Sequence, residues 1–319
     1  MIRKIKESFE AAWRPALRSA LWLLKIMIPV SILVTTLQYI GFIQWISVYT
    51  EPLFSFIGLR GEAALVLTTS AFLNLYSALA VIQSIPFTAK EVTILSLMCL
   101  IAHNLIVETA VQKKTGSSAV KMVIIRIAGA IIAGVCLNKF IPETGNFLFK
   151  AVETNKSVPL KEVITNWATT SLLLSLRLVV IVISLNFMQK LMATFGIIQW
   201  LSSALAPIMN IFGLSRRSSL FWIVGNMVGL AYGASILIES RSKHLISAKE
   251  SDRLNHHLAL SHSLLEDTLI FVAIGVSWIW ITIPRIILAM ITVWGVYYIR
   301  RVYSYIKNYN APNKSNVFN

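Results

Sequence analysis

Apolar runs of about 20 residues follow one another along this chain, and this pattern restricts it to folds that cross a lipid bilayer. Of its 319 residues, 56% are hydrophobic and only 13% are charged, and its mean hydropathy is +0.70. Soluble domains carry about 25% charged residues. Because lipid offers the backbone no hydrogen-bond partners, the runs are expected to form helices. We therefore predict an all-α integral membrane protein.

The net charge of the chain is +15, which in a soluble protein would suggest nucleic-acid binding. Here the lysines and arginines flank the apolar runs, as they do at the cytoplasmic ends of membrane helices. The expected partner is thus the bilayer and not a nucleic acid. The distribution of these residues also predicts that both termini are cytoplasmic.

The sequence repeats itself once along its length. Residues 41–59, GFIQWISVYTEPLFSFIGL, align with residues 196–214, GIIQWLSSALAPIMNIFGL. Equivalent pairs further on are His103 and His262, Glu108 and Asp267, and Arg126 and Arg285. Matches over such a length predict two copies of one structural unit.

Each copy contains four apolar segments, so we predict about eight transmembrane helices in two repeats of four. A short interfacial amphipathic helix is expected after the first span of each copy, at 45–58 and 200–213. Since four is an even number of crossings, the two copies should share one orientation, as in a parallel repeat. The expected spans are Leu21–Ile43, Glu62–Ile85, Glu91–Val111, Val120–Ile141, Trp167–Thr194, Ser218–Ser240, Arg253–Val276 and Trp278–Arg300.

The domain organisation follows from the repeat. Residues 1–145 form the first membrane repeat and residues 167–304 the second. Residues 146–166 form a linker and an amphipathic segment between them. Residues 305–319 are polar and predicted to be a disordered tail.

Polar residues gather inside the third span of each copy, where an ionisable group is by default a functional-site hypothesis. In the first copy these residues are His103, Asn104 and Glu108, and in the second they are His262, Ser263 and Asp267. Asn104 and Glu108 are four residues apart, which places them on one face of a helix.

An arginine follows each acid by 18 positions, Arg126 after Glu108 and Arg285 after Asp267. A helical hairpin with its turn midway would bring each acid and its arginine to the same depth. We therefore predict two intramembrane ion pairs, Glu108–Arg126 and Asp267–Arg285. Such pairs can be purely structural or can take part in the chemistry of a site.

The two histidines have several possible roles. Each could hydrogen-bond a neighbouring helix, relay protons or bind a metal ion. His103, His262 and Glu266 are the candidate metal ligands. The sequence contains neither HExxH nor a paired CxxC, so spacing gives no strong metal signal.

The second span of each copy also contains polar residues that could bind a solute. These are Asn74 and Tyr76 in the first copy and Asn226 and Tyr232 in the second. Polar side chains at mid-membrane are how small transporters bind their substrates. The glycines at 225, 229 and 233 are consistent with that role or with close helix packing.

The chain resembles a known family. The stretch GLRGEAALVL (58–67), the polar second span, the segment KEVTILSLMCLIAHNLIVETAVQKKTG (90–116) and Arg126 resemble the nucleoside-recognition, or Gate, family. That family includes spore maturation proteins A and B, and Gate segments occur in ferrous-iron transport protein B and concentrative nucleoside transporters. In the second half Arg216 and Arg217 stand where Gly61 and Glu62 stand in the first.

This resemblance implies a multi-pass transporter or permease of a bacterial cytoplasmic (inner) membrane. Its solute would be small and polar, such as a nucleoside, bound between the two repeats. The alternatives are a divalent metal ion permease and a non-transporting scaffold of the spore-maturation type, as a homo-oligomer or with a membrane partner. We expect no enzyme activity and no cofactor, because no nucleophile, base and orienting group stand at a recognisable spacing.

Overall fold

The computed structural model describes residues 2–142, 146 and 158–309, and all regular secondary structure in these residues is helical. The first half contains α1 (Ile2–Tyr39), α2 (Phe42–Phe54), η1 (Ser55–Ile57), α3 (Ala63–Phe72), α4 (Leu75–Ser84), α5 (Ala89–Ala102), α6 (Leu105–Lys114) and α7 (Ala119–Phe140). The second half contains α8 (Leu160–Thr194), α9 (Ile197–Leu205), η2 (Ile208–Asn210), η3 (Arg216–Ser218), α10 (Ser219–Met227), α11 (Leu230–Ser242), α12 (Ala248–Ser261), α13 (Glu266–Val272) and α14 (Trp278–Tyr309).

Among the described residues, 5 helices are long and apolar enough to cross a membrane. They are α1, α5 together with α6, α7, α8 and α14. The protein is therefore an all-helical membrane protein, as the composition predicts. The other expected spans, 62–85, 218–240 and 253–276, are each divided between two shorter helices.

The first divided segment, α3–α4, is a hairpin that returns to the side from which it entered. Arg60, just before α3, lies 2.9 Å (Nε–Oε1) from Glu91 in the first turn of α5. Its Nη2 also donates to the carbonyl of Pro86, just after α4. The start of α3 and the end of α4 therefore lie together. Asn74 begins α4 by accepting a hydrogen bond from the Ser77 N–H at 3.0 Å.

The segment α10–α11 is also a hairpin. Trp222 in α10 donates to His257 in α12 at 3.1 Å. Three residues further along α10, the Gly225 carbonyl accepts from the Ser263 N–H, just after α12, at 3.0 Å. The segment from α12 to Ser263 therefore runs alongside α10 in the same direction. α11 turns back against α10, since a Cβ on Gly233 would meet the Gly225 backbone at 3.2 Å.

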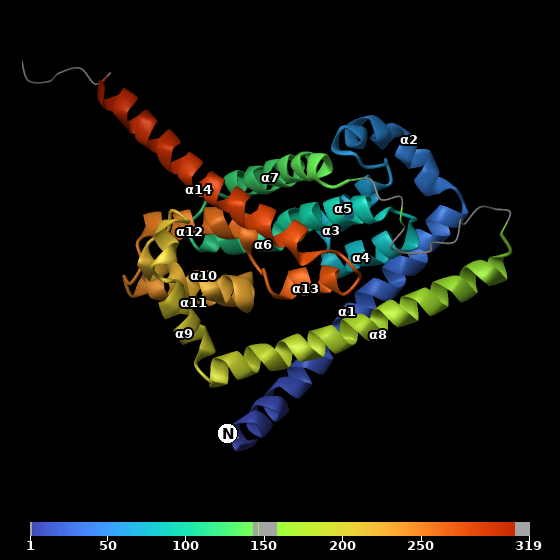
Figure 1. Cartoon of the computed structure of the whole chain (residues 1–319), viewed down its shortest axis with the longest axis horizontal. Coiled ribbons are helices and arrows are strands. Elements are labelled where there is room, and N and C mark those ends of the chain that lie inside the picture. The colour runs from blue at the N-terminus through green and yellow to red at the C-terminus, as the bar shows by residue number, and fades with distance from the viewer. Residues whose placement is uncertain (1, 143–145, 147–157, 310–319) are drawn as a thin grey trace, which may run out of the picture.

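The two halves run in opposite directions. The Ser8 hydroxyl near the start of α1 donates to Thr194 at the end of α8 over 3.1 Å. At the other end, Trp167 Nε1 in α8 donates to Ser31 Oγ in α1 over 3.1 Å. Figure 1 shows the same relation, with α2 at one end of the molecule and α9 at the other.

The junction of α6 and α12 leads to the same conclusion. Thr115, which ends α6, accepts at its carbonyl from Ser251 Oγ at 2.5 Å, and Ser251 lies in the first turn of α12. α12 thus begins where α6 ends, so it runs against α5 and α6. The expected parallel relation between the halves is wrong. Each hairpin returns instead of crossing, which removes one of the four expected crossings from each half.

The apolar core is concentrated on the middle helices. The first core cluster centres on α4 and α5, where Leu79, Leu95 and Leu100 are at most 1% exposed, and the second lies around α10 and α12. The long helices α1, α8 and α14 bury only 22–33% of their most apolar windows. Their exposed apolar faces suit a lipid environment, which does not require apolar side chains to be buried.

Parts of the expected linker (146–166) and of the expected tail (305–319) are helical. Leu160 to Asn166 form the first turns of α8, and α14 extends to Tyr309, beyond the start of the expected tail at 305. Residues 147–157 and 310–319 lie outside the described residues.

Candidate functional site

The centre of the molecule contains two helix breaks. Between α5 and α6, Asn104 has a positive φ of 45°, and its N–H donates to the Ser70 carbonyl at 2.8 Å. Between α12 and α13, Ser263 has a φ of 50°. Left-handed backbone is uncommon for residues other than glycine, and such strain clusters at functional sites.

A histidine ends the helix before each break. His103 Nδ1 lies 3.0 Å from the Cys99 carbonyl, and His262 Nδ1 lies 2.8 Å from the Leu258 carbonyl. Since a carbonyl oxygen only accepts, both Nδ1 atoms bear hydrogens. This orientation points the two Nε2 atoms at each other across 3.3 Å.

Two carboxylates complete what we call the histidine–carboxylate centre: His103, His262, Glu108 and Asp267. Glu108 spans both rings, with Oε1 at 2.9 Å from His103 Nε2 and Oε2 at 2.9 Å from His262 Nε2. Asp267 Oδ2 lies 3.4 Å from His103 Nε2. The acid side chains are 12% and 13% exposed, so the centre is almost entirely enclosed by protein.

Arg126 joins the centre to the first helix break. Its Nη2 lies 2.6 Å from Glu108 Oε2, as the residue spacing predicts. Its Nε donates to the Ile101 carbonyl at 2.8 Å and its Nη2 to the His103 carbonyl at 2.6 Å. A helix end leaves such carbonyls without partners. Arg126, which is 0% exposed, therefore stabilises both the acid and the broken helix.

Arg285 has only part of this role, and the predicted Asp267–Arg285 pair is wrong: these residues form no ion pair within 4.0 Å in the described structure. Arg285 donates from Nε to the Leu260 carbonyl at 3.1 Å and from Nη2 to the His262 carbonyl. Its guanidinium is thus held by the second helix break. Asp267 lies instead against His103, a contact between the halves.

The centre brings together groups that repel unless a cation is present. With hydrogens on Nδ1, a neutral imidazole has only a lone pair at Nε2. Two such lone pairs and the carboxylate oxygens then face one another at 2.9–3.4 Å. A proton on one Nε2, or a metal ion between the groups, relieves this repulsion. The arrangement is therefore suited to binding and releasing a cation.

The other candidate residues of the third spans lie beside the centre or apart from it. Asn104 and Ser263 form the helix breaks themselves. Glu266, a candidate metal ligand, lies apart from the group of three possible ligands, His103, His262 and Asp267. It accepts a hydrogen bond from Gln189 of α8 at 3.2 Å.

The candidates of the second spans lie in the two hairpins. Asn74 serves as the N-cap of α4, and Tyr76 packs against the first core cluster. Asn226 Nδ2 donates to the Trp222 carbonyl at 2.8 Å, while its buried Oδ1 has no hydrogen-bond partner in the part of the chain that the structure describes. Tyr232 belongs to α11, and its side chain lies outside the described part of the structure.

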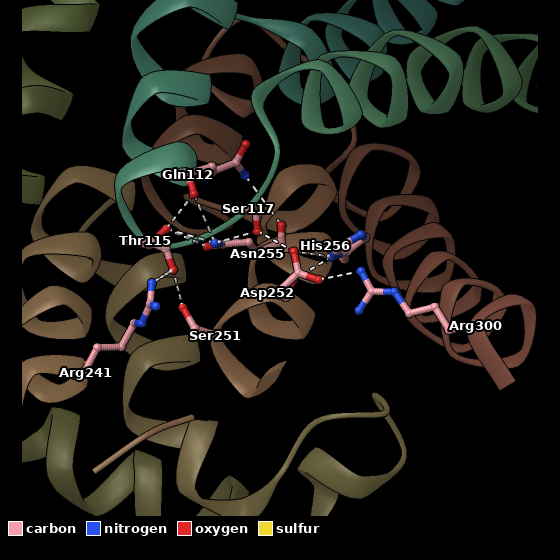
Figure 2. Close-up of polar contacts among 9 residues, drawn as sticks. All are labelled: Gln112, Thr115, Ser117, Arg241, Ser251, Asp252, Asn255, His256 and Arg300. Atoms are coloured by element: carbon pink, nitrogen blue, oxygen red, sulfur yellow. Dashed lines mark hydrogen bonds and ion pairs between the residues drawn. The ribbon is translucent and has the colours of Figure 1, made fainter. Parts of the chain in front are cut away.

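A second polar cluster, which the sequence did not predict, joins the halves where α6 ends and α12 begins (Figure 2). Asn255 Nδ2 donates to Thr115 Oγ1 at 2.8 Å and to Ser117 Oγ at 2.9 Å. Ser117 Oγ donates to Asp252 at 2.7 Å. Thr115 and Ser117 stand in a short polar turn of ordinary composition, so no sequence signal indicated their partners in the other half.

These features define a class: an all-helical membrane protein with a buried histidine–carboxylate centre at paired helix breaks. Residues 20–131 match the model of the Gate family, described as nucleoside recognition. The match includes His103, Glu108 and Arg126, so this part of the chain is similar to a Gate domain, as the resemblance implies.

A bacterial membrane protein is similar to the chain over most of its length. Over 275 residues the chain is 29% identical to the uncharacterized membrane protein YvoD of Bacillus subtilis (strain 168). The alignment covers 85% of this chain and 88% of the relative. The similarity therefore extends well beyond the Gate domain into the second half.

Proposed function

We propose that the protein is a membrane permease that moves a small polar solute, with protons bound and released at the histidine–carboxylate centre. The convergence of His103, His262, Glu108 and Asp267 between the two halves is the observation that supports this proposal most directly. Buried ionisable groups at facing helix breaks are typical of transport sites. We infer a carrier and not an enzyme.

We further propose that the halves are two inverted copies of one unit. The order of the elements and the contacts of Arg126 and Arg285 recur in opposite orientations. Inverted repeats with broken helices can open a central site to either side in turn. The centre lies where the two copies meet, which is where such a mechanism requires the solute.

A nucleoside is one solute class to test, because the matched family is described as nucleoside recognition. Ser70 Oγ and Asn226 Oδ1 lie beside the helix breaks, are buried and have no hydrogen-bond partner among the described residues. Such atoms can hydrogen-bond the hydroxyls or the base of a polar solute.

The positions of the lysines and arginines support our proposal that the protein lies in a bacterial cytoplasmic membrane with both termini on the cytoplasmic side. The start of α1 lies beside the end of α8. Arg216 and Arg217 follow α9, the helix that begins just after the end of α8, and lysines and arginines are enriched in cytoplasmic loops.

The proposal is tested in proteoliposomes that contain the purified full chain. Uptake of labelled nucleosides would be followed with and without an imposed pH gradient. We expect uptake that the gradient accelerates, and at least a tenfold loss in the His103→Gln/His262→Gln variant. No uptake of any solute, with a membrane protein stably co-purified, would support the scaffold alternative instead.

A second candidate is a divalent metal permease, and one observation favours it. The Nε2–Nε2 and Nε2–Oδ2 distances are 3.3 and 3.4 Å. A tetrahedral site with bonds of about 2.0–2.2 Å has ligand separations of about 3.3–3.6 Å. Metal-bound histidines also commonly donate their other ring N–H to a carbonyl, as both do here.

Metal analysis separates the two candidates. For a metal permease, zinc or ferrous iron should bind to purified wild-type protein with a stoichiometry near one, and Asp267→Asn should weaken binding at least tenfold. Nucleoside uptake that is unaffected by chelators would exclude the metal as the solute.

A further inference from the structure

A basic groove between α12 and α14 lies apart from the central site. It encloses a cavity of about 600 Å³. Lys249, Arg253 and His256 line it from α12, and Tyr297, Arg300 and Arg301 line it from α14. The spacing of these residues places each set on one face of its helix, so two cationic helix faces are opposed across the cavity.

The charges of the groove are not balanced within the protein. Arg300 lies 2.6 Å from Asp252 Oδ2, and the Arg253 guanidinium lies 5.1 Å from the centre of the Tyr297 ring. Among the described residues, no acid lies within ion-pair distance of Lys249, Arg253 or Arg301. Cations held close together repel one another, so an anion in the cavity would be strongly favoured.

His256 gives the cavity a buried polar atom without a partner. The residue is 1% exposed, and its Nδ1 lies 2.5 Å from the Asp252 carbonyl. Within residues 2–142, 146 and 158–309, its Nε2 has no hydrogen-bond partner. Figure 2 shows the His256 ring on the Arg300 side of Asp252. An anionic oxygen beside Nε2 would give that atom a partner and would favour the imidazolium form.

The groove lies at the level of lipid headgroups. On α14, Tyr298, Tyr303 and Tyr305 are 55%, 69% and 73% exposed, and exposed tyrosines mark the membrane–water interface. Val293 and Val296 line the cavity toward the apolar part of α14. The groove thus combines an anion site with an apolar wall, which is the arrangement that an anionic lipid requires.

We propose that this groove binds the phosphate headgroup of an anionic phospholipid. Arg300, Arg301 and Arg253 contact the phosphate oxygens, and His256 Nε2 donates to one of them. The groove adjoins the polar cluster that joins the halves, because Asp252 contacts both Arg300 and Ser117. A bound lipid would therefore strengthen the junction between α6 and α12.

The test uses the purified full chain in detergent and short-chain phosphatidylglycerol, with phosphatidylcholine of the same chain length as the zwitterionic comparison, which has no net charge. Binding would be followed by native mass spectrometry and by the shift in melting temperature. We expect phosphatidylglycerol, and not phosphatidylcholine, to bind and to raise the melting temperature. Arg253→Gln/Arg301→Gln should weaken this binding at least tenfold, and His256→Gln severalfold.

The matched control is Arg14→Gln/Arg18→Gln, which removes the same charge from two exposed residues of α1 and should leave binding unchanged. Equal weakening in this control would overturn the proposal, because binding would then reflect net charge alone. Equal binding of glycerol phosphate without acyl chains would overturn the lipid assignment in favour of a soluble phosphate. Unchanged lipid-free melting temperatures show that the variants fold, and none of these results depends on solute transport.

Discussion

His103 Nε2 and His262 Nε2 lie 3.3 Å apart although the residues are separated by 159 positions. Each ring is fixed by the helix that ends at it, through an Nδ1 contact with a carbonyl four residues earlier. The pair is thus held by both halves of the chain. Any movement of one half relative to the other changes this distance and with it the affinity of the centre for a cation.

The first prediction concerns this pair. Replacing both histidines by glutamine should remove the dependence of transport on pH between about 5 and 8, because histidine is the side chain that titrates there. Uptake would be measured in proteoliposomes at several pH values. As a control, His244→Gln on the exposed turn after α11 should retain the wild-type profile.

The second prediction concerns the Glu108–Arg126 pair. Glu108→Gln should lower the free energy of unfolding by about 3–5 kcal/mol, because it leaves Arg126 buried without its counter-charge. The double replacement Glu108→Gln/Arg126→Met should lower the free energy of unfolding less than Glu108→Gln alone. Thermal unfolding in detergent measures both effects. Equal melting temperatures for the single variant and the wild type would contradict this account.

The exposed pair Glu239–Lys243 supplies a control for that experiment, since its side chains are 64% and 62% exposed. Glu239→Gln should leave the melting temperature unchanged, because solvent screens exposed ion pairs.

The third prediction concerns Arg285. Arg285→Lys should lower the melting temperature by several degrees, since a lysine cannot reproduce the fork that donates to the Leu260 and His262 carbonyls. The same change at Arg301, which is exposed on α14, should have no effect on stability. A stable Arg285→Lys variant would show that the second helix break does not need the guanidinium.

The fourth prediction tests the opposed directions of the halves. With the native cysteines replaced by alanine, cysteines at positions 8 and 194 should form a disulfide under mild oxidation, because the native hydroxyls lie 3.1 Å apart. Gel mobility after oxidation would report the crosslink. Cysteines at 8 and 170 should not react, and crosslinking of that pair in place of the first would contradict the antiparallel arrangement.

The sequence was sufficient to predict the helical membrane character and to single out the polar residues of the third spans, but not to predict that both histidines meet Glu108. Ionisable residues inside apolar runs cost free energy, so His103 and Glu108 were recognisable without a structure. The spacing of Glu108 and Arg126 predicted their contact. The same spacing between Asp267 and Arg285 gave a wrong prediction. Spacing along the chain carries no information about His103, which contacts Asp267 from the other half.

The hairpins could not be predicted in the same way. Segment 62–85 has the length and composition of a span, and its break at Asn74 contains neither proline nor glycine. The contacts of Arg60 with Glu91 and with the Pro86 carbonyl show that the segment returns. Counting each hairpin segment as a crossing gave four crossings in each half, which is an even number. The incorrect prediction that the halves share one orientation followed from that count.

The hairpins α3–α4 and α10–α11 enter the protein from opposite ends, and each one touches a different helix break through the carbonyls of Ser70 and Gly225. In the proposed permease, each end of the molecule therefore has its own hairpin next to the histidine–carboxylate centre. Substitutions that loosen one hairpin should alter entry from one compartment only, so the rates of uptake and release can be tuned separately.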